Sequence, residues 1–520
     1  MTVKNRNLYL SVLVKVKITL LKARTHWIHI TVLAVVFIGA FSYTFDSKLA
    51  MLGDNASYFM LGKALAGGEG YVNISSSAKK PSNHYPPGYP VIISAVMLFS
   101  DSLTAVKIVT GILGLGGLIL FYFLACKLLD NEFMALGVTL LAALNAHILW
   151  YSSLVMSEVP FLCFSVMALF FFTKTDTEKF NLKDKYVWLT LLSLISAYYV
   201  RSLGVALMGG FVLALLFKKN WKSIGLYIGV FALAIAPWSI RASNLGGSSY
   251  LRQLKMINPY QPALGQADIG DFIDRFFENF SRYITKELPD AIFPAFEPGY
   301  GQQATGGQWF AGLLLLGIMI YGIFKLKDHR WLITGYLLGT FAILMLWPQV
   351  WIGVRFIVSV LPLLILLLIV GLYQVAAWVV KRANQKVVYG ALMSLFLLFQ
   401  FGAIADIHNQ AKEKYSPGWK NYFEMAKWLD RNVNGEAVVA CGNPSLFHLY
   451  ANKYTLRYKF ANPEEVLKHL EERQVDYVVI DQVYGNTLRY LLPAVQQYPE
   501  RFQQVQHLTN PDTYLLKFKR

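Results

Sequence analysis

The chain has 520 residues, of which 55% are apolar and only 15% are charged, and its mean hydropathy is +0.41. This composition excludes an ordinary soluble protein and places the chain in a lipid bilayer, among membrane lipids. The net charge of +17 would suggest nucleic acid in a soluble protein, but we interpret it as membrane topology and predict no nucleic-acid partner.

Hydropathy predicts about eleven membrane-spanning helices, since a spanning helix needs roughly 20 mostly apolar residues. The first follows a basic leader, but its apolar run is too long for a signal peptide, so we expect a retained helix. The predicted spans are 27–45, 103–126, 132–150, 158–174, 186–200, 203–217, 222–240, 308–324, 331–347, 355–378 and 386–405.

Two apolar stretches need a further decision. The run from Tyr89 to Phe99 is too short to span, so we predict a partly inserted or interfacial helix. The run from Tyr186 to Phe217 fits either one long tilted helix or a hairpin. Basic residues at both of its ends favour the hairpin, which places Arg201 at the outer tip.

Lysine and arginine in the short loops fall on alternate ends of the predicted spans, as the positive-inside rule requires. We therefore expect a multi-pass protein of the plasma membrane, the inner membrane in bacteria, with a cytoplasmic N-terminus. The pieces left outside, in the periplasm of a bacterium, are 46–90, 151–158, 241–307 and 406–520. The protein is expected to work on its outer face.

The last of these pieces alternates helical and strand patterns. "YFEMAKWLDRNV" and "NPEEVLKHLEERQ" have helical periodicity, whereas "EAVVAC", "DYVVID", "FQQVQHL" and "TYLLKFK" are typical of strands. We predict a helical membrane domain over 1–405 and a small extracytoplasmic α/β domain over 406–520. No glycine-rich loop follows a predicted strand, so the tail carries no nucleotide-site signal.

Ionisable residues gather near the predicted outer boundary, where they are costly unless they are used or reach into water. Asp54, in "GDNASYFMLGKAL", suits the N-cap of a short helix and equally suits a carboxylate that does chemistry. The two interpretations are compatible, because a cap fixes the direction of the carboxylate. Glu158, in "MSEVPF", fits a helix start with Ser157 as its cap.

The remaining candidates are basic or aromatic. In "NHYPPGYP", the tandem prolines favour a rigid loop, with His84 and Tyr85 either anchored at the interface or in contact with a ligand's polar head. Arg201, Arg241 and Arg355 suit interfacial anchors, and equally a grip on a lipid phosphate, because a guanidinium bonds two oxygens and stays charged.

In order along the chain, these motifs resemble the GT-C superfamily of membrane glycosyltransferases. The resemblance rests on an acidic residue early in the first outer loop, the Pro-Pro motif, "SEVPF", "YVRSLG", "PWSIRASN" and the arginine of "VRFIVSVLPLL". It is strongest to the branch that includes aminoarabinose transferase and protein O-mannosyltransferases, and the tail resembles the outer α/β domain of many members. Aminoarabinose transferases have a lysine where this chain has Tyr85.

The resemblance implies an inverting enzyme that moves a sugar from a polyprenyl-phosphate donor to a lipid, glycan or protein acceptor. It implies that Asp54 is the general base and Glu158 the second acidic residue. His84, Tyr85, Arg201, Arg241 and Arg355 are then candidate donor or phosphate ligands. No cofactor is required, and the acidic pair leaves room for a divalent metal.

A transporter or lipid flippase is the alternative from another class. Transporters usually bind their substrates near the membrane midplane and often consist of two related halves. This chain instead gathers its polar groups at one face and has no evident half-repeat, which favours the glycosyltransferase.

Overall fold

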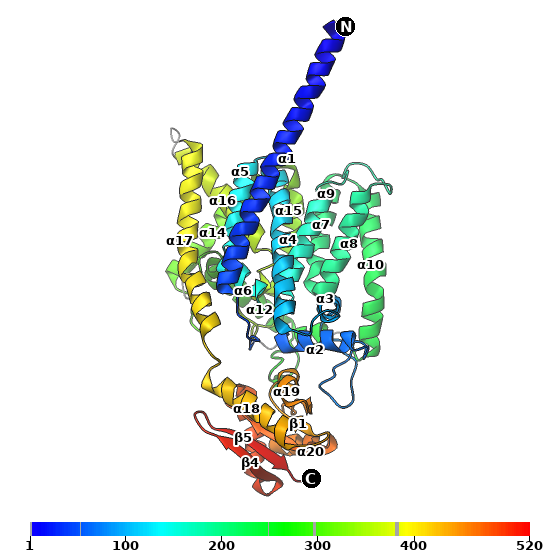
Figure 1. Cartoon of the computed structure of the whole chain (residues 1–520), viewed down its shortest axis with the longest axis vertical. Helices are drawn as coiled ribbons and strands as arrows, with labels where there is room; N and C mark the ends of the chain where they lie inside the picture. Colours follow the sequence, from blue (N-terminus) through cyan, green and yellow to red (C-terminus); the bar gives the residue numbers. More distant parts are fainter. Residues whose placement is uncertain (1–2, 52–53, 248, 295–297, 380–383) are drawn as a thin grey trace.

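A bundle of apolar helices carries a small α/β domain at one end (Figure 1). The computed structural model describes residues 3–51, 54–247, 249–294, 298–379 and 384–520. Within these residues, a helix stands at each predicted span. These helices are α1 (Val3–Thr44), α4 (Leu103–Leu129), α5 (Glu132–Ala143) with α6 (Ala146–Ser152), α7 (Glu158–Phe172), α8 (Lys185–Val200), α9 (Val205–Phe217), α10 (Trp221–Asn244), α14 (Gly306–Phe324), α15 (Arg330–Met345), α16 (Leu361–Val379) and α17 (Gln385–Lys412).

The apolar helices differ in length. Six helices of the described chain are long and apolar enough to cross a membrane, or seven if α5 and α6, bent by 62°, form one broken span. The predicted hairpin is confirmed, because α8 ends at Val200 and Arg201 is extended. These helices indicate a multi-pass membrane protein.

Shorter elements lie at the end of the bundle that faces the α/β domain. They are α2 (Asp54–Ala66), α3 (Gly88–Met97), α11 (Ser249–Leu254), α12 (Ile269–Arg282) and α13 (Leu288–Ile292), with the π-helical η3 (Tyr283–Glu287) and the 3-10 turns η1 (Ser202–Gly204), η2 (Pro262–Leu264) and η5 (Val354–Phe356). The 3-10 turn η4 (Lys327–His329) lies between α14 and α15. Figure 1 shows α2 lying across the bundle end, between the bundle and the α/β domain. Most side chains of α2 are buried, as expected for a helix covered on more than one side.

Helices α14 and α16 approach each other through glycines, which let backbones come close in a membrane bundle. A Cβ at Gly322 would overlap the carbonyl oxygen of Leu367, and a Cβ at Gly371 would overlap that of Ile318. We expect Gly322→Ala to lower the free energy of unfolding by about 1–3 kcal/mol, because the helices must separate. Unfolding in detergent, followed by tryptophan fluorescence, measures this loss.

Gly317→Ala is the matched control, since it lies on the same helix and a Cβ there meets no atom within 4 Å. Equal losses from the Gly322 and Gly317 substitutions would contradict the close approach and point to helix-wide effects instead.

The α/β domain follows α17 and contains a five-stranded sheet in the order β2-β1-β3-β5-β4. Strand β1 pairs in parallel with β2 and β3, and β5 pairs antiparallel with β3 and β4. Its elements are α18 (Pro417–Asn432), β1 (Val438–Ala440), α19 (Pro444–Ala451), β2 (Tyr454–Leu456), α20 (Pro463–Glu472), β3 (Tyr477–Ile480), η6 (Thr487–Leu491), α21 (Leu492–Gln497), η7 (Pro499–Arg501), β4 (Phe502–Leu508) and β5 (Thr513–Phe518).

The sequence patterns predict four of these strands and miss β2, which has only three residues. The division expected after residue 405 falls inside α17, which continues to Lys412.

Candidate functional site

Four charged side chains from distant parts of the chain form one cluster at the end of the bundle. Arg355 Nη2 lies 2.5 Å from Asp54 Oδ2, and Arg355 Nε lies 3.1 Å from Glu158 Oε1. Arg201 Nη1 lies 2.6 Å from the same Glu158 oxygen. The cluster therefore runs Asp54, Arg355, Glu158, Arg201, with two negative charges facing two positive ones.

Hydroxyl groups complete the cluster. The Tyr85 hydroxyl donates to Asp54 Oδ1 at 2.8 Å. The Tyr58 hydroxyl donates to Ser157 Oγ at 3.1 Å, and Arg201 Nη1 donates to the same oxygen at 3.2 Å. The rings of Tyr58 and Tyr85 pack with centroids 4.5 Å apart. Asp54 thus has both carboxylate oxygens bonded, one by a hydroxyl and one by a guanidinium.

Local backbone features place these side chains. Glu158 opens α7, and Arg201 is the extended residue at the break between α8 and η1. Gly353 has φ +105°, which glycine adopts freely, and this turn precedes η5 with Arg355. The predicted helix from residue 355 therefore starts later, at Leu361, and Arg355 precedes it.

The two expected helix caps differ from the observed contacts. Asp54 is the first residue of α2, and within the described residues its carboxylate accepts from Tyr85 and Arg355 rather than from the amides of that helix. The expectation that Ser157 caps α7 is wrong, because Ser157 is helical and makes no side-chain cap bond. Its hydroxyl accepts from Tyr58 and Arg201 instead.

The environment sets the charge of Asp54. Burial alone would raise the pKa of the Asp54 carboxyl, but Arg355 and the Tyr85 hydroxyl outweigh burial and hold that pKa below its usual value. Asp54 is therefore ionised at pH 7.

His84 lies beside this group, with its ring centroid 4.3 Å from that of Tyr85 and 5.4 Å from that of Tyr250. Burial lowers the pKa of the His84 imidazole in spite of the nearby Asp54 carboxylate, so His84 is neutral at pH 7.

Arg241 makes different contacts. Its Nη1 donates to the carbonyl oxygen of Ser82 at 2.5 Å and its Nη2 to that of Tyr71 at 3.2 Å. The guanidinium also packs against the rings of Tyr71 and Trp238. These contacts fasten the loop between α2 and α3 to the end of α10, next to a cleft of about 470 Å³. The role of Arg241 as a phosphate ligand stays a prediction.

A second polar group lies next to the cluster. Arg282 Nε lies 2.7 Å from Glu287 Oε1, and that oxygen also accepts from the amide of Gly353 at 3.4 Å. Arg282 Nη1 donates to the carbonyl oxygen of Gln349 at 2.9 Å. Arg282 and Glu287 therefore hold the segment that leads to Arg355. Sequence periodicity does not reveal them, because they lie in an amphipathic helix and a π-helical turn of the long segment between α10 and α14.

His147, in the short helix α6, is paired with Asp290. Its Nε2 lies 3.3 Å from Asp290 Oδ1, and the Tyr300 hydroxyl donates to Asp290 Oδ2 at 3.4 Å.

The acidic pair does not suit a divalent metal. Asp54 and Glu158 share one guanidinium, and a cation between them would have to displace Arg355. Across the described ranges, no group of three or more His, Cys, Asp or Glu side chains is arranged to hold a metal ion.

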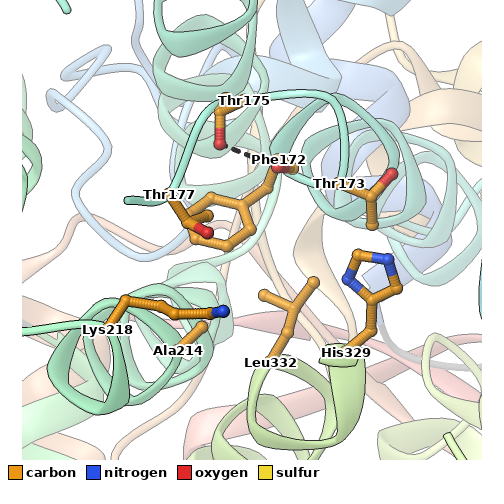
Figure 2. Close-up of a pocket in the computed structure, with 8 residues that line it drawn as sticks. All are labelled: Phe172, Thr173, Thr175, Thr177, Ala214, Lys218, His329 and Leu332. Atoms are coloured by element: carbon orange, nitrogen blue, oxygen red, sulfur yellow. Dashed lines mark hydrogen bonds between the residues drawn. The ribbon is translucent and has the colours of Figure 1, made fainter. Parts of the chain in front are cut away.

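A cavity of about 210 Å³ lies at the other end of the bundle. Figure 2 shows its lining, which includes Phe172, Thr173, Lys218 and His329. Phe172 ends α7, whereas Glu158 begins it, so this cavity is roughly 20 Å from the cluster. None of its lining residues, all in the described chain, is a carboxylate, and Lys218 pairs with Glu178. The paired carboxylates therefore mark the better candidate site.

Residues 56–245 match the protein family described as dolichyl-phosphate-mannose-protein mannosyltransferase. The matched region contains Glu158, Arg201 and the Pro-Pro loop, and it begins two residues after Asp54. A search of curated proteins gave no match.

Solved structures share the architecture of the chain. ArnT from Cupriavidus metallidurans in the apo state has a TM-score of 0.58 at 13% sequence identity, covering 95% of this chain and 98% of that chain. ArnT from the same organism bound to undecaprenyl phosphate has a TM-score of 0.58 at 12% sequence identity, and the match covers 94% of this chain and 98% of that chain. The Archaeoglobus fulgidus oligosaccharyltransferase tethered with an acceptor peptide has a TM-score of 0.55 at 10% sequence identity, and the match covers 95% of this chain and 74% of that chain. At these identities the likeness concerns the fold.

Proposed function

From the GT-C fold of this chain and the mannosyltransferase-family match over 56–245, we propose that the protein is a membrane glycosyltransferase that uses a polyprenyl-phosphate sugar. The observation that carries this proposal is the buried Asp54–Arg355–Glu158–Arg201 cluster at one end of the bundle. It supplies an ionised carboxylate beside positive charge, the two things that sugar transfer from a lipid phosphate needs.

In the proposed reaction, Asp54 accepts the proton of the acceptor hydroxyl. The acceptor oxygen forms a bond to the anomeric carbon as the bond from that carbon to the phosphate oxygen breaks, and the lipid phosphate leaves with the electron pair. Attack opposite the leaving group inverts the anomeric configuration, which NMR of the product measures against the donor. Retained configuration would exclude this single displacement.

Glu158 has a positioning role in this proposal. It is 1% exposed as a side chain and bonds both Arg201 and Arg355. Arg355 in turn fixes the direction of the Asp54 carboxylate. Ordinary Coulomb attraction weakens Asp54 as a base, because the paired carboxylate has a lowered pKa. When the substrate phosphate arrives and pairs with Arg355, the ion pair between Arg355 and Asp54 would weaken. The pKa of Asp54 would then rise, which makes Asp54 a stronger base.

The proposed site faces the outer side of the membrane. The basic short loops at 174–185, 218–222, 325–330 and 381–386 all belong to the end predicted to be cytoplasmic. The acceptor is a lipid, a glycan or a protein, and the division into a catalytic unit over 1–405 and an α/β unit over 406–520 belongs to the same proposal. A transporter or flippase is the alternative, but a cluster at one end rather than at the midplane argues against it.

Tyr85→Phe tests the electrostatics of the base. Removing the hydroxyl takes away a hydrogen bond that favours ionised Asp54, so the Asp54 pKa rises. Because the base must be ionised, the acid limb of the pH profile of kcat/KM moves to higher pH, and activity well above that limb changes little. Tyr71→Phe is the control, since its hydroxyl donates to the Tyr85 carbonyl and not to a carboxylate. A profile of Tyr85→Phe identical to wild type would remove Asp54 from the base role.

A further inference from the structure

The two positive charges of the catalytic cluster are balanced by its two carboxylates before a phosphate arrives. Arg201 and Arg355 are both paired with Asp54 and Glu158, and His84 is neutral at pH 7. Arg241 has no carboxylate partner in the described chain, but two of its nitrogens already bond carbonyl oxygens of the first outer loop. A departing lipid phosphate adds at least one negative charge to a partly buried site, so a further cation is needed.

The α/β domain lies against the outer loops on both sides of the site. On one side, the amide of Thr455 in β2 donates to the carbonyl oxygen of Ser75 at 2.6 Å. On the other, the Tyr490 hydroxyl donates to the carbonyl oxygen of Tyr260 at 3.3 Å. Tyr260 in turn accepts from Trp351, four residues before Arg355. The domain therefore covers the region between the first outer loop and the Arg355 segment.

Arg457 is linked to both attachments, to one along the chain and to the other through packed rings. It follows β2 two residues after Thr455, and its guanidinium packs over the ring of Phe460, 5.9 Å from the centroid. Phe460 stacks on Tyr490 with centroids 5.1 Å apart. Arg457 is exposed, and within the described chain its guanidinium makes no ion pair or hydrogen bond. Its charge also contributes to the lowered pKa of the His84 imidazole.

We propose that Arg457 of the α/β domain binds the phosphate of the donor lipid. This inference rests on the proposed function and gives the α/β domain a part in the site. The N–H groups of the Arg457 guanidinium can donate to the phosphate oxygens. Its positive charge balances the negative charge of the phosphate, which the cluster does not neutralise.

Binding of two matched lipids tests the proposal. Undecaprenyl phosphate and undecaprenol differ only in the phosphate, and native mass spectrometry of the full-length protein in detergent gives the Kd for each. Arg457→Ala should raise the Kd for undecaprenyl phosphate by about 10-fold to 100-fold, the loss of affinity expected when a charged hydrogen-bonding partner is removed. Binding of undecaprenol should not change, and Arg457→Lys should keep part of the affinity.

Arg473→Ala is the matched control, because Arg473 is also an exposed arginine of the α/β domain and lies at the end of α20. It should bind both lipids like wild type. Wild-type affinity in Arg457→Ala, or an equal loss in Arg473→Ala, would overturn the assignment of Arg457. Displacement of the lipid by excess inorganic phosphate would assign Arg457 to free phosphate and overturn the lipid proposal.

Failure of the proposed function has a different signature. In that case the wild-type protein binds undecaprenyl phosphate no better than undecaprenol, and both proposals fall. A wild-type preference for the phosphate that survives in Arg457→Ala overturns only the role of Arg457.

Discussion

Asp54→Asn should reduce sugar transfer by about 10²-fold to 10⁴-fold, the range that a positioned general base contributes. Asparagine keeps an oxygen to accept from Tyr85, so the local structure should persist, but it cannot take a proton from the acceptor. The measurement is kcat with purified protein and a polyprenyl-phosphate sugar. KM for the donor should change far less than kcat, because the loss lies in the chemical step.

Asp46→Asn is the control for this substitution. Asp46 lies in the segment between α1 and α2 and pairs with Lys48, away from the cluster contacts. It should transfer sugar at the wild-type rate. Near-wild-type transfer by Asp54→Asn would show that Asp54 is a structural residue only.

Glu158→Gln should lower the free energy of unfolding by about 3–5 kcal/mol, because breaking a buried ion pair leaves uncompensated charge. Glu158 bonds two guanidinium groups, and one of its oxygens, Oε2, is already without a partner among the described residues. Glutamine keeps the shape but removes the charge that both arginines face. Unfolding in detergent, followed by tryptophan fluorescence, measures the loss.

Two further variants keep this prediction decisive. Glu132→Gln also changes the first residue of an apolar helix, but its partner His26 is 3.6 Å away and partly exposed, so the loss should stay below about 1 kcal/mol. Adding Arg201→Gln to Glu158→Gln should restore part of the stability, because one unpaired charge disappears. Strictly additive losses in the double variant would contradict the buried ion-pair network.

Hydropathy and periodicity predict much of the secondary structure of this chain, because membrane helices and sheets both require regular patterns of apolar residues. The positions of the apolar helices, the break at Arg201 and four strands of the α/β domain follow from apolar runs, basic turns and alternation. Strand β2 is not predictable in this way, because three residues are too few to show a period. The bent pair α5 and α6 looks continuous in hydropathy, since α5 ends at Ala143 and the single polar residue Asn145 caps α6 within an otherwise apolar run.

The candidate site is only partly predictable from the sequence. Predicted depth in the membrane groups Asp54, Glu158, Arg201 and Arg355, and the structure brings their side chains together. Their pairing is not predictable, since Arg355 lies 301 positions from Asp54 and no local pattern links them. Arg241 shares their depth but bonds backbone carbonyls. Arg457, which we propose as a phosphate ligand, follows β2 of the α/β domain, and no local pattern links it to the cluster.

The lipid product tests the proposed function most directly. The purified wild-type protein is incubated with an extract of membrane lipids, and mass spectrometry follows every polyprenyl-phosphate sugar. We expect one such species to decrease while polyprenyl phosphate increases in equal amount, and we expect no conversion with Asp54→Asn. If no polyprenyl-phosphate sugar is consumed by the wild-type protein, or if Asp54→Asn consumes it at the same rate, the proposed glycosyl transfer at this cluster is contradicted.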